Sequence, residues 1–254
     1  MEHWTRAPRA GRGLPVVTRS VRVDGLGPVD LVIFDNDGVL VDSEALSSAT
    51  LAEVLTAYGV PTTPAQCRRD FTGGTPSLIR QVIEARAGRP LPASFEAAFA
   101  ARLIERFQRR LRPCPGIPAL LDFLGRVGVP YCVASNGTRE RIEAALRAVG
   151  LLDRFTGRIF SAAEVARPKP APDLFLQASA ALRVPADRCL VIEDTPPGIA
   201  AARAAGMRVW APAGTYPPDE LGGADRVSAS TAVLAAELQA ALAAQRGVTS
   251  GQTD

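Results

Sequence analysis

The sequence predicts an α/β protein in which a Rossmann-like parallel sheet is interrupted, after its first strand, by an inserted domain of helices. Three features lead to this prediction. From residue 117 onward, short apolar runs alternate with helical stretches, which is typical of a parallel sheet. The run at 31–34 is apolar without alternation, as in a strand covered on both faces. Between residues 43 and 113, no segment has the pattern of a strand.

Composition and periodicity divide the chain into core, inserted domain and two tails. Residues 1–28 are rich in arginine, glycine and proline, so we expect a flexible basic tail there. Residues 29–42 and 114–244 should form the core, residues 43–113 the inserted helical domain, and residues 245–254 a polar tail. With 254 residues, 47% of them apolar, the chain is long enough to bury a sizeable core.

The spacing of apolar residues and of helix-capping or helix-stopping residues predicts the order of the elements. In the inserted domain we expect four helices, near residues 43–59, 64–70, 76–87 and 93–111. In the core after residue 114 we expect helices near 117–127, 138–150, 173–182, 195–206 and 231–244, and strands near 129–134, 158–160, 189–192, 207–210 and 227.

The net charge of +3 comes from the N-terminal segment. Residues 1–28 hold five arginines and two acidic residues, and the remaining basic and acidic residues balance. The core therefore provides no overall field for nucleic acid, and we expect no nucleic-acid partner. The tail is interpreted as a solvated extension, with contact to a polyanion as the alternative. No apolar run approaches the roughly 18 residues of a membrane span, and we expect a cytoplasmic protein without a membrane partner.

Histidine and lysine each occur once, and both facts restrict the chemistry. The histidine is His3, in the tail, which excludes histidine-dependent triads and histidine-ligated metals from the core. The lysine is Lys169, in a chain whose other basic residues are all arginine, which indicates that an ammonium group is needed at that position. The four cysteines stand far apart without a CxxC pair, so free thiols are expected rather than disulfides or zinc ligands.

Polar residues follow three of the predicted strands, at the point where each strand ends. The first strand is followed by Asp35 and Asp37, the second ends in Ser135 and Asn136, and the third is followed by Glu193 and Asp194. Each group alone has a structural explanation, since Asp-Asn-Asp-Gly is also a favourable turn sequence. If the strands are parallel neighbours, however, all three groups lie at one edge of the sheet, where ligands bind in such folds. An active site explains this placement best.

Four motifs together resemble those of the haloacid dehalogenase-like hydrolases. They are DNDGVLVDSE at 35–44, SNG at 135–137, PKPAPD at 168–173 and EDTPPG at 193–198, in the order and spacing of that family. The resemblance covers residues 29–244 and is greatest to the branch with a small helical cap, in which the phosphatases similar to β-phosphoglucomutase are found. It implies a Rossmann-like core, and it implies that residues 43–113 are the cap that closes over the active site.

The resemblance implies phosphoryl transfer, and the carboxylates suit that chemistry. Asp35 would attack phosphorus and form an aspartyl-phosphate, and Asp37 would protonate the leaving alcohol and then activate water. The repulsion between carboxylate and phosphate calls for Mg²⁺, whose implied ligands are Asp35, the backbone carbonyl of Asp37, and Asp194. Glu193 would be either a ligand through water or a neighbour that orients the ligands.

The resemblance also implies which residues hold the substrate. Ser135 and backbone amides would bind phosphoryl oxygens, with Asn136 beside them, and Lys169 would place a point charge next to the phosphate and Asp35. In the cap, Thr75 and Arg80 lie in or near the loop that selects substrate in related proteins. Arg80 is interpreted either as a substrate contact or as a solvated helix residue.

These observations predict a Mg²⁺-dependent phosphatase for a small phosphorylated metabolite, a sugar or sugar-acid phosphate, which acts as a monomer or weak dimer. A phosphosugar mutase of the β-phosphoglucomutase type is the first alternative. In that mutase a histidine lies on the first cap helix and an arginine follows the glycine of the cap loop, and the matching residues here are Ser47 and Pro76. A regulatory protein that keeps the fold without turnover is the second alternative, against which the intact set of acidic residues argues.

Overall fold

A six-stranded parallel sheet forms the centre of the molecule. The computed structural model describes residues 21–23 and 27–244. The strands lie in the order β5-β4-β3-β6-β7-β8, and every pair of neighbours is parallel. Their bounds are β3 (Leu31–Phe34), β4 (Tyr131–Ser135), β5 (Ile159–Ser161), β6 (Cys189–Ile192), β7 (Arg208–Pro212) and β8 (Arg226–Ser228). The sheet confirms the predicted α/β class, and the three strands that carry polar residues at their ends are direct neighbours.

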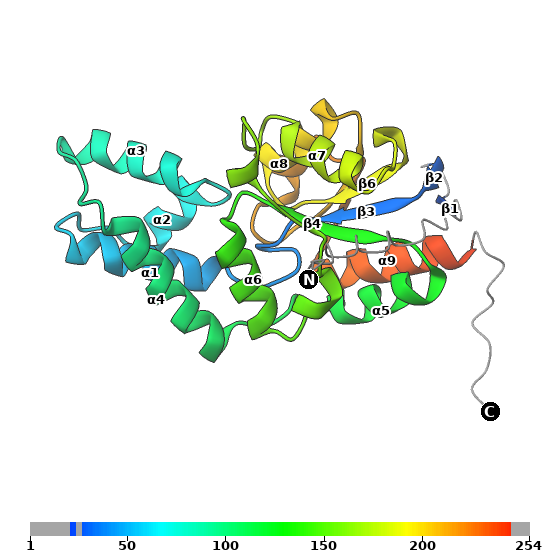
Figure 1. Ribbon diagram of the computed structural model, residues 1–254, viewed down its shortest axis with the longest axis horizontal. Coiled ribbons are helices and arrows are strands. Elements are labelled where there is room, and N and C mark those ends of the chain that lie inside the picture. Colours follow the sequence, from blue (N-terminus) through cyan, green and yellow to red (C-terminus); the bar gives the residue numbers. More distant parts are fainter. Residues whose placement is uncertain (1–20, 24–26, 245–254) are drawn as a thin grey trace, which may run out of the picture.

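Helices cover both faces of this sheet (Figure 1). The helices α5 (Ile117–Val127), α6 (Arg139–Ala148) and α9 (Thr231–Ala244) lie on one face, and α7 (Asp173–Ala181) and α8 (Pro196–Ala204) lie on the other. Val32 and Phe34 point into the apolar core on the first side, and Leu31 and Ile33 point into the core on the second. This alternation between two buried faces explains why the run at β3 is apolar at every position.

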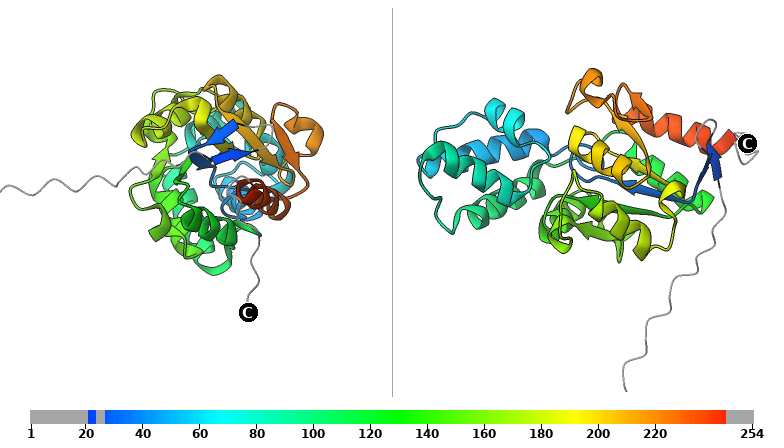
Figure 2. Two further views of the ribbon diagram at one scale, coloured as in Figure 1. Left: turned by 90° about the vertical axis from the view of Figure 1, so that its right-hand side faces the viewer. Right: turned by 90° about the horizontal axis from the view of Figure 1, so that it is seen from above.

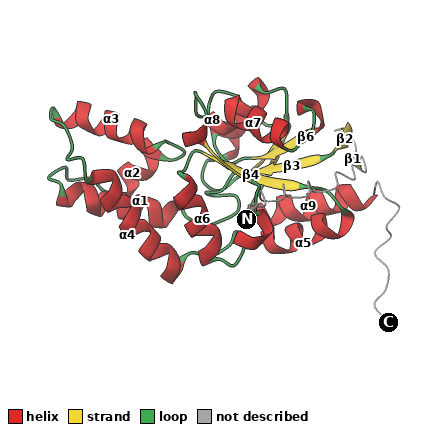
Figure 3. Cartoon of the chain, viewed as in Figure 1, coloured by secondary structure: helices red, strands yellow, loops and turns green. Residues whose placement is uncertain are grey.

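The inserted domain is a separate lobe built from helices alone, as Figures 2 and 3 show. Its helices are α1 (Glu44–Ala57), α2 (Pro64–Phe71), α3 (Pro76–Ala87) and α4 (Phe95–Arg110). The predicted helices agree with these to within two residues at most ends. The side chains that recur every four residues along α4 are all buried, and they form the centre of the lobe: Phe95, Phe99, Leu103 and Phe107.

Two connections join the lobe to the core, and they lie side by side. The chain leaves the core after Val41, which forms an isolated bridge with Pro113 on the returning segment. The amide of Asp42 donates to the carbonyl of Arg112 at 3.0 Å, and the amide of Cys114 donates to the carbonyl of Leu40 at 3.0 Å. This paired connection places the lobe over the edge of the sheet at which β3 ends.

The N-terminal segment differs in part from the prediction. Strands β1 (Val21–Val23) and β2 (Gly27–Val29) pair in an antiparallel hairpin, and the sequence pattern did not predict them. Residues 1–20 and 24–26 of the predicted basic tail, and the predicted C-terminal tail 245–254, lie outside the described residues. The unpredicted short 3-10 helices are η1 (Leu152–Phe155), η2 (Ala162–Glu164), η3 (Ala186–Arg188) and η4 (Pro218–Leu221).

Two further expectations concern the described part of the chain. None of its helices is long and apolar enough to cross a membrane. All four cysteines are buried free thiols, as expected from their separation in the sequence.

Candidate active site

A cavity of about 60 Å³ lies between the carboxyl ends of β3, β4 and β6 and the cap. The core side of its wall contains the predicted residues Asp35, Asp37, Ser135, Asn136, Lys169 and Glu193. The cap contributes the N-terminal half of α1 and the loop that follows α2, including Ser47 and Gly73. Residues from five separate segments therefore meet at the predicted edge of the sheet.

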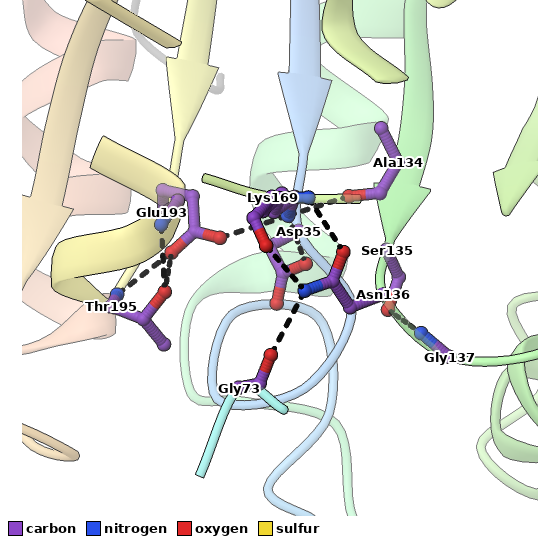
Figure 4. A network of polar contacts seen from close by, with 10 residues as sticks. Asp35, Gly73, Ala134, Ser135, Asn136, Gly137, Lys169, Glu193 and Thr195 are labelled. Carbon is purple, nitrogen blue, oxygen red and sulfur yellow. Dashed lines mark hydrogen bonds and ion pairs between the residues drawn. The ribbon is translucent and has the colours of Figure 1, made fainter. Parts of the chain in front are cut away.

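Lys169 is the centre of the polar network in this cavity (Figure 4). Its Nζ donates to Asp35 Oδ1 at 2.6 Å, to Glu193 Oε1 at 2.8 Å and to the carbonyl of Ala134 at 2.9 Å. The side chain is 3% exposed, and these three bonds use all three protons of the ammonium group. Burial alone would lower the pKa of Lys169, but the charges of Asp35 and Glu193 outweigh burial and raise it. The group is therefore a fixed positive charge.

Asp35 is the first residue beyond β3, and the strand fixes its position. Its amide donates to the carbonyl of Ile192 at 2.9 Å, which ties the start of the loop to β6. Burial raises the pKa of Asp35 to about 7, with Lys169 opposing the rise and Glu193 adding to it. A positive charge brought near this carboxyl group stabilises its ionised form. The ionised form is the one that can act as a nucleophile.

Asp37 is held on the other side of the loop, by partners different from those of Asp35. Its Oδ1 accepts hydrogen bonds from Ser43 Oγ and from Arg141 Nη2, the second at 2.9 Å. Gly38 has a φ of +79°, a conformation that only glycine adopts readily, and its amide donates to the carbonyl of Val41 at 2.8 Å. The tight turn thus separates two carboxylates that lie only two residues apart.

Asp194 has the features expected of a cation ligand. Its Oδ2 accepts a hydrogen bond from Thr215, whereas its Oδ1 is buried and has no hydrogen-bond partner. Burial, then Glu193 and Asp35, raise the pKa of Asp194 well above its ordinary value. The Gly38 backbone passes so close that a Cβ there would stand 2.0 Å from Asp194 Oδ2. An orphaned carboxylate oxygen beside a backbone loop suits a hard cation with oxygen ligands.

The described residues do not contain a cluster of three or more acidic, histidine or cysteine side chains that could hold a metal ion by themselves. A cation site here would have to combine Asp35 and Asp194 with a backbone carbonyl, which the family resemblance implies to be that of Asp37. Oxygen donors of these kinds fit Mg²⁺, which commonly binds one or two carboxylates and keeps several waters.

Glu193 is the partner of Lys169. Its Oε1 accepts from Lys169, and its Oε2 accepts from the amide of Thr195 at 2.7 Å and from the hydroxyl of Thr195 at 2.9 Å. Both oxygens are therefore occupied by protein donors. Of the two roles considered for Glu193, this arrangement agrees with a neighbour that orients the site.

Ser135 and Asn136 lie at the end of β4, as predicted, but the amide group of Asn136 does not face an open phosphate site. Its Nδ2 donates to the carbonyl of Gly73 in the cap at 2.9 Å, and its Oδ1 accepts from the amide of Lys169 at 3.2 Å. Asn136 thus joins the cap to the core. Ser135 Oγ lines the cavity and accepts from the amide of Gly137 at 3.1 Å.

The structure corrects the assignment of Arg80 as a substrate-binding residue. The guanidinium group lies within the cap and donates to the carboxylates of Glu96 and Glu84 and to the carbonyls of Leu91 and Pro92. These five bonds use all five of its N–H groups. Arg80 therefore holds cap helices together and has no donor left for a ligand.

Thr75 is likewise not part of the cavity wall. Its hydroxyl caps α3 by accepting from the amide of Leu78 at 3.3 Å, and the residue lines a neighbouring groove between α3 and the loop at Pro168. The cap residues that do reach the cavity include Gly73 and Gly74.

Sequence reasoning missed Arg141, which approaches Asp37 from the first turn of α6. A signal for it exists, because a cation in the first turn of a helix opposes the helix dipole and calls for another explanation. Sequence reasoning also missed Thr215, the partner of Asp194, and Ser43, a partner of Asp37. Thr215 lies in an irregular loop after β7, where no pattern indicates the direction of a side chain.

The chain is similar in sequence and in fold to known proteins. Residues 29–206 match the family model of the haloacid dehalogenase-like hydrolases. The chain is 28% identical to 6-phosphogluconate phosphatase of Escherichia coli (strain K12), over 72% of this chain and 81% of that protein. It is 30% identical to validoxylamine A 7'-phosphate phosphatase of Streptomyces hygroscopicus subsp. limoneus, over 70% and 82%. The crystal structure of CbbY from Rhodobacter sphaeroides with phosphate superposes with a TM-score of 0.71 and 28% identity, over 81% and 96%.

Proposed function

Since this chain belongs to the haloacid dehalogenase-like hydrolases and is a phosphoric monoester hydrolase, we propose that it is a Mg²⁺-dependent enzyme for a small sugar or sugar-acid phosphate. The observation that carries the proposal is the buried contact of Asp35 with the chain's single lysine, at 2.6 Å, with Asp37 held separately across a two-residue turn. One carboxylate is thereby set up to attack and the other to transfer protons.

The first half of the reaction forms an aspartyl-phosphate. One oxygen of Asp35 attacks phosphorus, and the bond between phosphorus and the leaving oxygen breaks, with its electron pair passing to that oxygen. Asp37 donates the proton that turns the leaving group into a neutral alcohol. Lys169 stays beside the phosphoryl group as a fixed positive charge, and the hydroxyl of Ser135 faces its oxygens from the cavity wall while this charge moves.

The second half returns the enzyme to its starting state. Asp37, now a carboxylate, takes a proton from water as the water oxygen attacks phosphorus. The bond between phosphorus and Asp35 breaks, and the electron pair returns to the carboxylate. Inorganic phosphate leaves.

Mg²⁺, when bound, would neutralise charge on the phosphoryl oxygens. Asp35, the backbone carbonyl of Asp37, and Asp194 are the residues that would hold it. Glu193 keeps Lys169 in place through the bond at 2.8 Å, and Thr215 keeps Asp194 in place.

The mutase alternative finds less support in the cap. A mutase has to hold the second phosphate of a bisphosphate intermediate while that intermediate reorients. Arg80, the cap residue considered for this contact, has no donor left for it. Ser47, at the position of the mutase histidine, lies 3.5 Å from Arg141 Nη2 and carries no titratable group. A regulatory role without turnover does not explain why a second carboxylate, Asp37, is held apart from the first.

A phosphate-release assay tests the proposal. The purified full chain is incubated with a panel of sugar and sugar-acid phosphates, in millimolar Mg²⁺ and in excess EDTA, with Asp35→Asn as the control. We expect release that requires both Mg²⁺ and Asp35. Release that persists in EDTA refutes the metal role, and release by the variant refutes the nucleophile. Formation of glucose 6-phosphate from β-glucose 1-phosphate, with little free phosphate, identifies a mutase instead.

A further inference from the structure

We propose that Arg141 is a second anion-binding residue in the cavity, which selects phosphate monoesters whose leaving group carries its own acidic group, a carboxylate or a second phosphate. This inference rests on the proposed function and adds the class of substrate to it. The inference is argued from the contacts of the Arg141 guanidinium group.

Arg141 reaches the cavity from the core side, opposite the cap. It lies in the first turn of α6, lines the cavity, and has a side chain that is 17% exposed. Its Nη2 donates to Asp37 Oδ1 at 2.9 Å and lies 3.5 Å from Ser47 Oγ on α1 of the cap. The guanidinium group therefore stands between the proton-transferring carboxylate and the cap, where the leaving group of a substrate has to lie.

The guanidinium group of Arg141 has a donor that the protein does not use. Its Nε is buried and has no hydrogen-bond partner. A buried donor without an acceptor is unfavourable, and more so when it belongs to a charged group. In Arg80, by contrast, every N–H group has an acceptor. An oxygen supplied by a ligand would satisfy Arg141.

The other cation in the cavity wall cannot perform this task. Lys169 donates its three protons to Asp35, Glu193 and Ala134, and its place is beside the reacting phosphoryl group. Arg141 is thus the cation of the cavity wall that retains a free donor for another part of the substrate.

The geometry of a guanidinium group places the added anion near the reacting oxygen. Its Nε–H and one Nη2–H point from the same edge of the plane, which is why arginine binds carboxylates with two parallel bonds. Arg141 Nη2 is already at Asp37, which protonates the leaving oxygen. An acidic group held at Nε therefore belongs to the leaving group and not to the transferred phosphate.

If Arg141 only oriented Asp37 and did not bind substrate, the substrate preference would respond differently to its loss. If Arg141 only orients Asp37, its loss slows every substrate by the same factor. If it also binds an acidic group, its loss slows acidic substrates more than neutral ones. The ratio between a matched acidic and neutral pair, measured within one variant, cancels any effect on Asp37 and separates the two roles.

The experiment compares three matched pairs. In each pair one ester differs by one acidic group: 6-phosphogluconate against glucose 6-phosphate, 3-phosphoglycerate against glycerol 3-phosphate, and fructose 1,6-bisphosphate against fructose 6-phosphate. For the wild type we expect kcat/KM to favour the acidic member of at least one pair by about tenfold or more, the range of a charge-assisted hydrogen bond. Arg141→Gln should reduce this ratio to about one, and Arg141→Lys should restore part of it.

Arg139→Gln is the matched control. Arg139 lies one half-turn earlier on α6, but its guanidinium binds Glu164 and the carbonyl of Ile159, and its side chain is 46% exposed. We expect the wild-type ratio in this variant. A wild-type ratio near one in all three pairs, or an undiminished ratio in Arg141→Gln, overturns the inference while phosphate release still supports the phosphatase.

A binding measurement keeps the inference testable if turnover is slow. Calorimetric titration of Asp35→Asn with both members of a pair gives two dissociation constants that do not depend on chemistry. Tighter binding of the acidic member, lost in the double variant Asp35→Asn and Arg141→Gln, supports the second anion site. Equal binding of both members contradicts it. If the wild type hydrolyses no ester and binds none, the proposed function fails together with this inference.

Discussion

A single ammonium group forms ion pairs with two buried carboxylates at the edge of the sheet. The contacts of Lys169 with Asp35 and Glu193 are 2.6 and 2.8 Å long, and its own side chain is 3% exposed. A compact point charge with three protons fits three acceptors, whereas a planar guanidinium group is larger and directs its donors differently. The chain uses arginine at every other basic position, so the choice of lysine here has a steric reason.

We expect Lys169→Arg to be damaging although it conserves the charge. The larger group has to displace its neighbours, at a cost of about 1–3 kcal/mol in the free energy of unfolding, and kcat should fall by about a hundredfold or more. Denaturant unfolding and phosphate release measure the two effects. Arg167→Lys, two residues earlier at a side chain that is 69% exposed, is the control and should behave as the wild type. An active Arg variant at 169 would show that the position only requires charge.

Among the elements, α8 positions the site without lining much of it. Glu193 leans over the first turn of this helix, and a Cβ at Gly198 would stand 1.8 Å from Glu193 Oε1. Thr195 both caps the helix, by accepting from the amide of Gly198 at 3.1 Å, and donates to Glu193. The start of α8 and the orientation of Glu193, which accepts from Lys169, are therefore coupled through Thr195.

This coupling predicts that Gly198→Ala lowers the activity of the enzyme. The added methyl group cannot coexist with Glu193 in its present position, so Lys169 loses an acceptor and kcat should fall by about tenfold or more. Gly125→Ala is the control, because a Cβ at Gly125, inside α5, meets nothing within 4 Å. Alanine should stabilise that helix by roughly 0.5–1 kcal/mol and leave activity intact. Wild-type activity in Gly198→Ala would exclude a positioning role for Glu193.

The elements themselves could be predicted from the sequence because their signals are local. The helix expected near 138–150 is capped by Thr138, and the strand at 189–192 has the predicted bounds. Side-chain direction was harder to predict, because it depends on packing between segments that are distant in sequence. Arg80 has the right chemistry for a substrate contact, but its direction is set by Glu96 on another helix. Arg141 was missed for the same reason, because its partner Asp37 lies 104 residues away.

At the scale of the whole molecule, the cap and the core meet over the cavity through few direct polar contacts. Asn136 provides one of them, because its Nδ2 donates to the carbonyl of Gly73 while its Oδ1 accepts from Lys169. The same side chain thus contacts the cap loop and the backbone of the residue that neutralises Asp35. The position of the cap loop and the order of the site are linked through this amide group.

We therefore expect Asn136→Ala to loosen the cap loop. Hydrogen exchange at the amides of Gly73 and Gly74 should be faster than in the wild type, and KM should rise with a smaller change in kcat, because the ordering of the loop is then left to the substrate. Gln81→Ala, in the adjoining groove, is the control. If exchange in the loop is unchanged, the contact with Gly73 does not hold the cap.

The ionisation of the buried carboxylates also affects the stability of the whole molecule. Burial raises the pKa of Asp35 to about 7 and raises that of Asp194 well above its ordinary value. A group whose pKa is higher in the folded state than in the unfolded state favours folding while it is protonated. For Asp35 this contribution is complete below pH of about 4 and is lost as the pH rises through about 7, and the contribution of Asp194 changes in the same direction.

Without a cation, the folded protein should therefore lose stability from Asp35 between pH 4 and 7, and ionisation of Asp194 should add to this loss. The proposed Mg²⁺ would bind the charged carboxylates, so the gain in Tm that it produces should be small at pH 5 and larger at pH 8. Thermal unfolding in EDTA and in millimolar Mg²⁺, across this range, measures the difference. Asp194→Asn removes one buried charge and one ligand, so its Tm in EDTA should depend less on pH and its gain with Mg²⁺ should be smaller. A gain in Tm that is independent of pH, or that is undiminished in Asp194→Asn, would show that the cation does not bind at the carboxylates at the sheet edge.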